Sequence, residues 1–441
     1  MLKNIIISIA LILTLSAHFA IKDKKSDPAP DGYAKYAYSI ASWGVYAIPD
    51  SSTEKPNPSV GRAPLYPYFL AAMIKISPKY AALVKNHIDG KTNDDLDAGI
   101  VPFVQMALMS IVGFVIFATA RLYGSNTFFA NLCMVIALVP LFSIAYRYRI
   151  SENLAIPLFA LSNFFLVLWF KHKPKLIYVF LCGLFLGLVA LTRVVHIYYL
   201  PFIVLFIAFI SPMGETLTIK RKAVVCLAIT LGVVITATPW IGRNMMHHSS
   251  GSIGDTGTYG VLAIRSEMNT MSVAEALGAS IYWLPDIGDT LAKKYLPKHT
   301  WERFDFSNPK CFRAQSRITL QEMRVQYAGT NKLKEALYLR VFSNPVGHLL
   351  AMIPLSIRGL RFVWIFVPFA LFALWQVRRT KQFSTLIGAS ALTITTFVIH
   401  VGITHFRGRY GMPMVVGFAP LGAIGLTFLW QWIGEKRRKH F

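Results

Sequence analysis

Residues 101–120 read VPFVQMALMSIVGFVIFATA, an uncharged and mainly apolar run that ends before Arg121. A helix needs about 20 such residues to cross the hydrocarbon core of a bilayer. Similar runs recur along the chain, and about ten of them meet this criterion. They lie at approximately 4–21, 100–120, 126–144, 153–170, 176–192, 194–210, 223–241, 360–377, 383–402 and 411–433. This repetition predicts an all-α polytopic membrane protein that forms one integral membrane domain over 1–441.

The composition supports this fold class and argues against two others. Of the 441 residues, 54% are apolar and 15% are charged, whereas an average soluble domain has about 25% charged residues. So apolar a chain does not have the composition of a disordered protein. Its net charge of +24 is spread between apolar runs and does not form the exposed basic patch of a soluble nucleic-acid binder. We therefore expect membrane lipids as partners, and no nucleic acid.

The basic residues of the short loops predict an orientation in the membrane. They are Arg121, Lys171, Lys173, Lys175, residues 220–222, Arg378, Arg379, Lys381 and residues 436–439. The positive-inside rule places these loops in the cytoplasm. The two long segments, about 22–99 and 242–359, then face the outside of the cytoplasmic membrane, where we expect the active site. We expect the run 4–21 to be a retained helix, because residues 16–20 offer no clean signal-peptide cleavage site.

Two charged side chains are notable in the first outer segment. Asp31 precedes a pattern of apolar residues, beginning with Tyr33 and Tyr36, that recur every three or four positions as on one face of a helix. Asp31 is therefore either the N-cap of that helix or a functional acid. Arg62 precedes the sequence APLYP, residues 63–67, which predicts a second short helix. Its guanidinium is either a lipid-headgroup contact or a bidentate phosphate ligand.

Five patterns, taken in order, point to a known superfamily. The first outer segment has an acid, a Tyr two residues later, a Trp-Gly pair, and an Arg-x-Pro-x-Tyr-Pro pattern that contains Arg62 and Tyr66. This layout resembles the polyprenyl-phosphate-dependent glycosyltransferases of the C fold class (GT-C), which include protein mannosyltransferases and lipid A aminoarabinose transferases. The resemblance continues at Ser151-Glu152 and at Leu-Thr-Arg, residues 191–193. It continues further at Pro-Trp-x-x-Arg-Asn, residues 239–244, and at Arg-Tyr-x-x-Pro, residues 409–413.

The resemblance implies a GT-C-like bundle and a sugar transfer that inverts the anomeric centre. The donor would be a polyprenyl-phosphate sugar, and the acceptor a lipid, a glycan or a protein. Asp31 would act as the general base that takes a proton from the acceptor, and Glu152 would orient the acceptor or Asp31. Arginines would stabilise the leaving phosphate. The substrate-binding candidates are Arg62, Tyr66, Arg147, Arg193, Arg243, Asn244, Arg407, Arg409 and Tyr410. For Arg147, pairing with Glu152 and binding phosphate are both open.

The same positions bear on cofactors. Some members of the superfamily have two adjacent acids where this chain has Asp31 followed by Gly32. One carboxylate with distant partners does not make a convincing divalent-metal site. Ligand spacing therefore does not support a divalent metal, but members of the superfamily differ in metal use, so a metal is left open and no cofactor is assigned.

The main alternative function is a transporter or flippase of lipid-linked sugars. It predicts charged or broken helices near the middle of the bilayer, whereas the ionisable residues named above cluster at the predicted outer edge. A polysaccharide polymerase or ligase would share the lipid donor, and a scaffold protein would need no such cluster.

Overall fold

The computed structural model describes residues 32–91, 99–171, 174–212, 216–248, 251–254, 258–330, 332–406 and 408–438. Every regular element in these ranges is a helix, and there is no strand among them. The chain divides into two compact units. Unit 1 comprises 1–254, 365–393 and 415–441, and unit 2 comprises 255–364 and 394–414.

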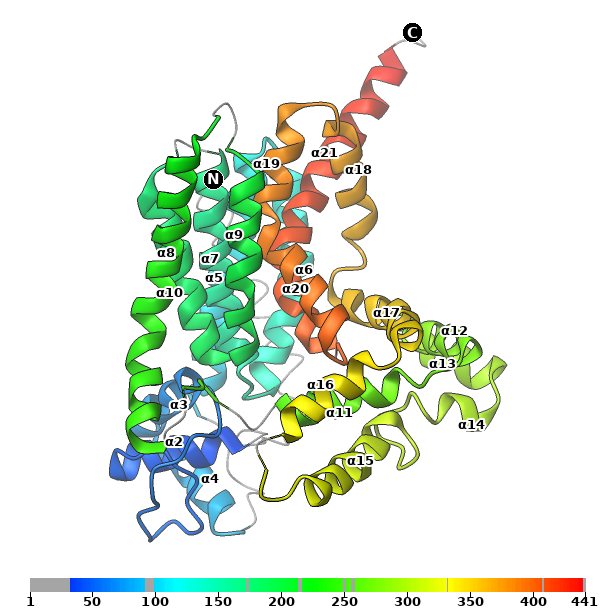
Figure 1. Ribbon diagram of the computed structural model, residues 1–441. Helices are drawn as coiled ribbons and strands as arrows, with labels where there is room; N and C mark the ends of the chain where they lie inside the picture. The colour runs from blue at the N-terminus through cyan, green and yellow to red at the C-terminus, as the bar shows by residue number, and fades with distance from the viewer. Residues whose placement is uncertain are drawn as a thin grey trace. The chain divides into compact units, whose positions relative to one another are not determined.

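Unit 1 contains a bundle of long apolar helices (Figure 1). Its elements are α5 (Val101–Leu122), α6 (Thr127–Arg147), α7 (Glu152–Lys171), α8 (Leu176–Thr192), η2 (Val194–Tyr198), α9 (Tyr199–Phe209), α10 (Ile219–His248), α18 (Val367–Val377), α19 (Lys381–Ala389) and α21 (Val415–Arg438). Helix α10 packs on α8, α8 on α7, α7 on α5 and α5 on α6, while α6 and α18 both pack on α21. The neighbours α5–α6 and α7–α8 are consecutive helices joined by short loops, whereas α7–α5, α10–α8 and α6–α21 bring together helices that are not consecutive.

Five described helices are each long and apolar enough to cross a membrane. The number rises to seven if two pairs of helices with short breaks are each counted as one span. Each expected run from 100 to 433 overlaps one or more described helices, although α8 and the pair η2–α9 are shorter than the five. The expected helix over 4–21 lies outside the described residues.

Two expected spans are interrupted in the structure. The run 360–377 was expected to be one helix, but α18 begins only at Val367, with Pro368 in its first turn. Proline cannot donate the backbone hydrogen bond that a continuous helix requires, so it is favoured at a helix start. The run 383–402 is divided at Ser390, the residue that ends α19. Both interruptions correct the expectation of uniform spans.

Glycines allow α8 and α10 to approach closely. A Cβ atom added at Gly183 would meet the backbone of Ile229, and one added at Gly187 would meet Thr236. From the other side, a Cβ atom at Gly232 would meet the backbone of α8. Gly183 and Gly187 are four residues apart and therefore share one helix face. Small residues at this spacing are typical of helix pairs in membranes, where close backbone contact provides van der Waals attraction.

Three shorter helices follow the predicted patterns of the first outer segment. They are α2 (Tyr33–Trp43), α3 (Leu65–Ile76) and α4 (Pro78–Ile88), and all three pack against one another. Their contact surface is apolar and includes the buried residues Tyr33, Tyr66, Leu70 and Tyr80. The two helices predicted after Asp31 and Arg62 are thus confirmed as α2 and α3.

Unit 2 is built from shorter helices. They are α11 (Thr258–Met268), α12 (Val273–Tyr282), α13 (Gly288–Tyr295), α14 (Lys298–Trp301), α15 (Phe312–Gln326), α16 (Leu333–Phe342), α17 (Pro345–Gly359), η3 (Leu360–Phe362) and η4 (Gly408–Met414). Helix α20 (Ala391–Ile403) begins in unit 1 and continues into unit 2. Helix α11 packs on both α15 and α16. A buried apolar cluster that includes Leu262, Met323 and Val341 joins these three helices.

Candidate functional site

An ion pair joins the beginning of α7 to the end of α8. The Nη1 atom of Arg193 lies 2.5 Å from Oε1 of Glu152, and the Glu152 side chain is only 3% exposed. Glu152 is the first residue of α7, where the helix dipole favours a carboxylate. Arg193 directly follows α8 in an extended conformation. The hydroxyl of Ser151 donates to Oε2 of Glu152 at 3.2 Å. Burying these charges is costly without such partners, so the close pairing explains why they are tolerated.

The first residue of α2 lies beside this ion pair. The Tyr33 hydroxyl lies near Ser151 and in the electrostatic field of Arg62, Arg193 and Glu152. The guanidinium carbon of Arg62 lies 5.5 Å from the centre of the Tyr33 ring. Burial is the largest effect on Tyr33 and raises the pKa of its hydroxyl above the ordinary value. A neutral hydroxyl and charged groups from three separate segments therefore meet in unit 1.

Asp31, the predicted catalytic base, lies outside the described residues. The N-cap of α2 is Gly32, with a left-handed φ of 79° and no side-chain capping bond. This corrects the interpretation of Asp31 as the N-cap, because Gly32 occupies that position. Glycine adopts a positive φ without the steric cost that a Cβ atom brings. Asp31 is two residues before Tyr33 in the sequence. Tyr33, Arg62, Glu152 and Arg193 are called the Glu152 cluster below.

Tyr66 packs inside the first outer segment. Its side chain has no exposed surface, and its ring meets that of Tyr33 edge to face at 5.3 Å. Its hydroxyl donates to the Gln105 amide oxygen at 2.9 Å, and the Gln105 amide nitrogen donates to the Ala145 carbonyl at 2.7 Å, in the amide orientation that satisfies both groups. Tyr66 thus links α3 to the bundle through an interior hydrogen bond.

The two arginines at the end of α6 differ in their surroundings. Arg147 is exposed at the last position of that helix. Arg149 is buried, and its Nη1 atom donates to the carbonyl of Arg147 at 2.6 Å. Charged groups that bond to the last carbonyls of a helix stabilise its end. Arg193, from a more distant segment, is the arginine whose ion pair with Glu152 the described structure shows.

Arg243 and Asn244 hold loops against the end of α10. Nη1 of Arg243 donates to the carbonyl of Ser59 at 2.9 Å, and its guanidinium carbon lies 4.8 Å from the Trp240 ring centre. Asn244 is fully buried, and its amide donates to the carbonyl of Ser252 at 2.7 Å. Both side chains therefore have protein partners, which makes them anchors of the surrounding loops in this structure.

The remaining described candidates belong to unit 2. Arg409 and Tyr410 lie in η4, with the Arg409 guanidinium carbon 5.6 Å from the Tyr410 ring centre. The Tyr410 ring stacks on His400 at 5.4 Å. Arg407 lies outside the described residues. Among the predicted residues, the structure therefore brings together Arg62, Glu152 and Arg193, all of unit 1.

The described side chains bear on whether a metal ion could be held at this site. In the part of the chain that the structure describes, no three His, Cys, Asp or Glu residues are grouped so as to hold one. Glu152 is the described carboxylate at the site, and it pairs with Arg193, whose charge opposes a cation there. No chemical step is therefore assigned to a metal.

This chain can be compared with known proteins by its sequence and by its fold. The fold and the buried charges at the ends of its helices define a multi-pass helical membrane protein. No protein-family model matches the sequence, and no curated protein matches it. The fold is similar to that of an oligosaccharyltransferase from Archaeoglobus fulgidus, whose crystal structure contains zinc and sulfate. The TM-score is 0.51 at 11% identity, over 97% of this chain and 49% of that protein.

This similarity concerns the fold. It confirms the expected polytopic, GT-C-like helical bundle. The chain spans about half the length of the oligosaccharyltransferase, with 49% of that protein covered. Sequence identity of 11% carries no residue-by-residue correspondence, so this similarity assigns no role to Asp31, Glu152 or Arg62.

Two site residues were not predicted as such from the sequence. Tyr33 was interpreted as part of an apolar helix face, and Ser151 as part of a helix start. Their positions next to Asp31 and Glu152 were the available signal. A polar group adjacent to a buried acid is the first candidate to hydrogen-bond it.

Proposed function

We propose that this protein is a membrane glycosyltransferase that moves a sugar from a polyprenyl-phosphate donor to a lipid, glycan or protein acceptor. The observation that carries the proposal is the buried Glu152–Arg193 pair in contact with the start of α2. Ionisable groups at the ends of membrane helices are expensive, and they commonly mark functional sites. The similarity of the fold to an oligosaccharyltransferase supports the same reaction class.

The reaction poses two demands. The acceptor oxygen or nitrogen attacks the anomeric carbon, and the bond between that carbon and the phosphate oxygen breaks. The acceptor must lose its proton as the new bond forms. The bonding pair leaves with the phosphate, whose negative charge must be stabilised. Attack from the face opposite the leaving group inverts the anomeric centre.

We assign the proton to the carboxylate of Asp31, acting as general base. General-base catalysis commonly contributes about 10²–10⁴-fold to a rate. Glu152 is assigned to orient the acceptor or Asp31, because its carboxylate is held in place by Arg193 and Ser151. Tyr33 supports this assignment, since it lies two residues from Asp31 and contacts Ser151.

We assign the leaving phosphate first to Arg62. The described structure contains no ion pair of this guanidinium, which lies over the Tyr33 ring. Arginine binds phosphate with two parallel hydrogen bonds. Arg147, Arg407, Arg409 and Tyr410 are further candidates for the donor headgroup. The basic loops support an active site at the outer face of the cytoplasmic membrane.

The test is sugar transfer by the purified protein in lipid nanodiscs. The assay offers a panel of polyprenyl-phosphate sugars with an envelope lipid and glycan extract, and it measures release of polyprenyl phosphate. We expect release by the wild type and a loss of about 10²–10⁴-fold in Asp31→Asn. Asp50→Asn is the matched control, because Asp50 is an exposed acid of the same segment.

The outcomes separate the parts of the proposal. Equal release by wild type and a folded Asp31→Asn variant would remove Asp31 from catalysis. No release by the wild type from any donor would contradict the enzyme class, and movement of intact donors across the bilayer would then favour a flippase. Loss in Arg62→Ala that Arg62→Lys does not restore would support bidentate phosphate binding.

A further inference from the structure

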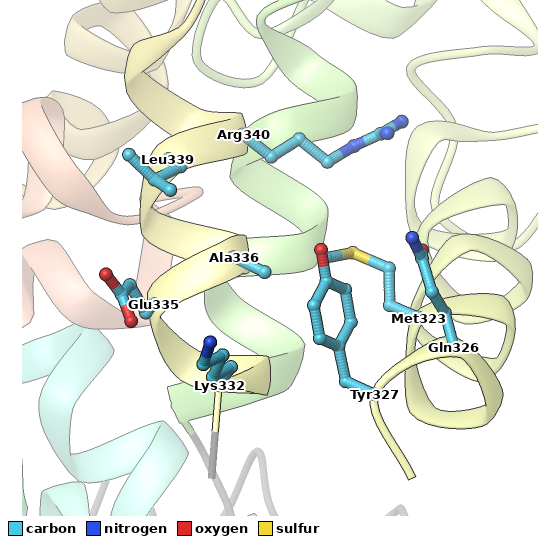
Figure 2. Close-up of a pocket in the computed structure, with 8 residues that line it drawn as sticks. All are labelled: Met323, Gln326, Tyr327, Lys332, Glu335, Ala336, Leu339 and Arg340. Atoms are coloured by element: carbon cyan, nitrogen blue, oxygen red, sulfur yellow. The ribbon is translucent and has the colours of Figure 1, made fainter. Parts of the chain in front are cut away.

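A groove lies between α15 and α16 of unit 2 (Figure 2). Its volume is about 420 Å³, within the range of about 300–1,000 Å³ that is common for small-molecule sites. It is lined by Met323, Gln326, Tyr327, Lys332, Glu335, Ala336, Leu339 and Arg340. None of these residues belongs to the site described above.

Helix α11 supports both walls of the groove, which are α15 and α16. Helix α11 contributes the buried residues Leu262 and Ala263 to a cluster with Met323 of α15 and Leu337 of α16. A largely buried carboxylate, Glu267 of α11, accepts from the hydroxyl of Thr319 at 2.9 Å and pairs with Nη2 of Arg340 at 3.0 Å. One acid thus ties both walls to the same base helix. The groove is a supported feature of unit 2, and its shape does not depend on exposed loops alone.

Arg340 is fixed by this contact but not covered by it. Its side chain is 46% exposed, and Figure 2 shows it extending from α16 toward α15, above the Tyr327 ring. A guanidinium has five N–H donors, so the pairing with Glu267 leaves further N–H donors of this exposed side chain for other partners. The groove therefore presents a preorganised donor beside an aromatic surface.

The polar groups of the groove include both donors and acceptors. Lys332 and Arg340 donate, Glu335 accepts, and the Gln326 amide and Tyr327 hydroxyl do both. The two cations are balanced by Glu335 and by Glu267 below. A phosphate would require mainly donors and positive charge, and an aliphatic chain would require neither. Hydroxyl groups, each a donor and an acceptor, match this mixture.

The apolar part of the groove matches the apolar face of a sugar ring. The Tyr327 ring, Met323 and Ala336 form an apolar surface among these polar groups. A sugar ring has an apolar face of C–H groups and a rim of hydroxyls. An aromatic side chain offers a large rigid apolar surface with a polar tip. We propose that the groove between α15 and α16 binds a neutral oligosaccharide, through stacking on Tyr327 and hydrogen bonds from Gln326 and Arg340.

The binding itself does not require sugar transfer. Only the further step, that the bound glycan is the acceptor or the growing product, rests on the proposed function. A carbohydrate site apart from the Glu152 cluster would retain a glycan chain independently of the lipid-linked donor.

The experiment measures glycan binding to the full chain in nanodiscs by saturation-transfer NMR. The probes are oligosaccharides of neutral hexoses, N-acetylhexosamines and pentoses, with inorganic pyrophosphate and phospholipid headgroups as competing probes. We expect binding of at least one neutral oligosaccharide, weakened about tenfold in Tyr327→Ala. Tyr295→Ala is the matched control, since Tyr295 is 68% exposed on α13, outside the groove.

Three results would overturn the proposal. One is no binding by any neutral oligosaccharide. Another is binding that Tyr327→Ala and Gln326→Ala leave unchanged in folded protein. The third is a groove that binds only pyrophosphate, with loss in Lys332→Ala. Binding that persists in Asp31→Asn would support the groove even if that variant transfers no sugar, so failure of the catalytic assignment and failure of this inference are distinguishable.

Discussion

The carboxylate of Glu152 and the guanidinium of Arg193 lie 2.5 Å apart, with 3% and 16% of their side chains exposed. This contact connects two consecutive helices at the end where the first outer segment also arrives through Tyr33. We propose two roles for this pair, one in the stability of the bundle and one in holding an acid at the proposed site.

The stability role predicts the effect of removing one charge. Arg193→Met leaves the buried Glu152 carboxylate without this partner, which commonly costs about 3–5 kcal/mol. The double variant Arg193→Met with Glu152→Gln should recover much of the loss, because neither charge remains. The measurement is the free energy of unfolding in detergent.

A control and a contrary outcome sharpen this prediction. Arg361 and Asp286 form a pair with 59% and 72% of their side chains exposed, so Arg361→Met should change stability by no more than about 1 kcal/mol. Equal effects of Arg193→Met and Arg361→Met would contradict a structural role for the buried pair.

The tyrosines of the first outer segment predict a loss of stability at alkaline pH. Burial is the largest effect on Tyr33, Tyr36 and Tyr46, and it raises the pKa of all three. Above about pH 10 the unfolded chain releases these protons, while the folded protein retains them. The unfolded state then binds fewer protons, so the free energy of unfolding falls as pH rises, by up to about 1.4 kcal/mol per pH unit for each tyrosine.

This pH dependence is checked by chemical denaturation across the alkaline range. Tyr36→Phe should reduce the slope of the free energy of unfolding against pH, because phenylalanine has no proton for the unfolded chain to release. Tyrosinate absorbance that develops fully before the protein unfolds would contradict the prediction.

Arg243 is predicted to act as an anchor. Its guanidinium bonds to the Ser59 carbonyl and the Asn244 side chain, and it stacks on Trp240. Arg243→Ala should cost about 2 kcal/mol, as for hydrogen bonds of charged groups. It should also expose residues 47–61 to limited proteolysis. Lys55→Ala is the control, since Lys55 is exposed in the same loop. Loss of donor binding with an intact loop would instead make Arg243 a ligand residue.

The glycines between α8 and α10 predict sensitivity to added volume. Gly183→Leu places a side chain where a Cβ atom would already meet the Ile229 backbone, and overpacking of this kind commonly costs about 1–3 kcal/mol. Gly434→Ala is the control, because an added Cβ atom there meets nothing within 4 Å. Thermal unfolding in nanodiscs provides the comparison. A neutral Gly183→Leu variant would show that α8 and α10 do not pack as described.

Several features were predictable from the sequence because they depend on local composition. The apolar run 101–120 predicts a spanning helix from its length alone, and α5 occupies Val101–Leu122. The apolar spacing after Asp31 and the prolines after Arg62 predict α2 and α3, which the structure confirms. The apolar run 153–170 predicts a further spanning helix, and α7 occupies Glu152–Lys171.

Other features were decided by tertiary packing. The sequence alone left open which groups pair with Glu152, and the packing of α7 on α8 brings Arg193 to it. The sequence predicts Arg243 as a substrate-binding residue, and only the folded loops show that its guanidinium also donates to the carbonyls of Ser59 and Tyr46. Hydrophobic length and helix periodicity act over neighbouring residues, so they can be read from the chain. The partner of a charge depends on distances between segments far apart in sequence, and only the packed helices determine those distances.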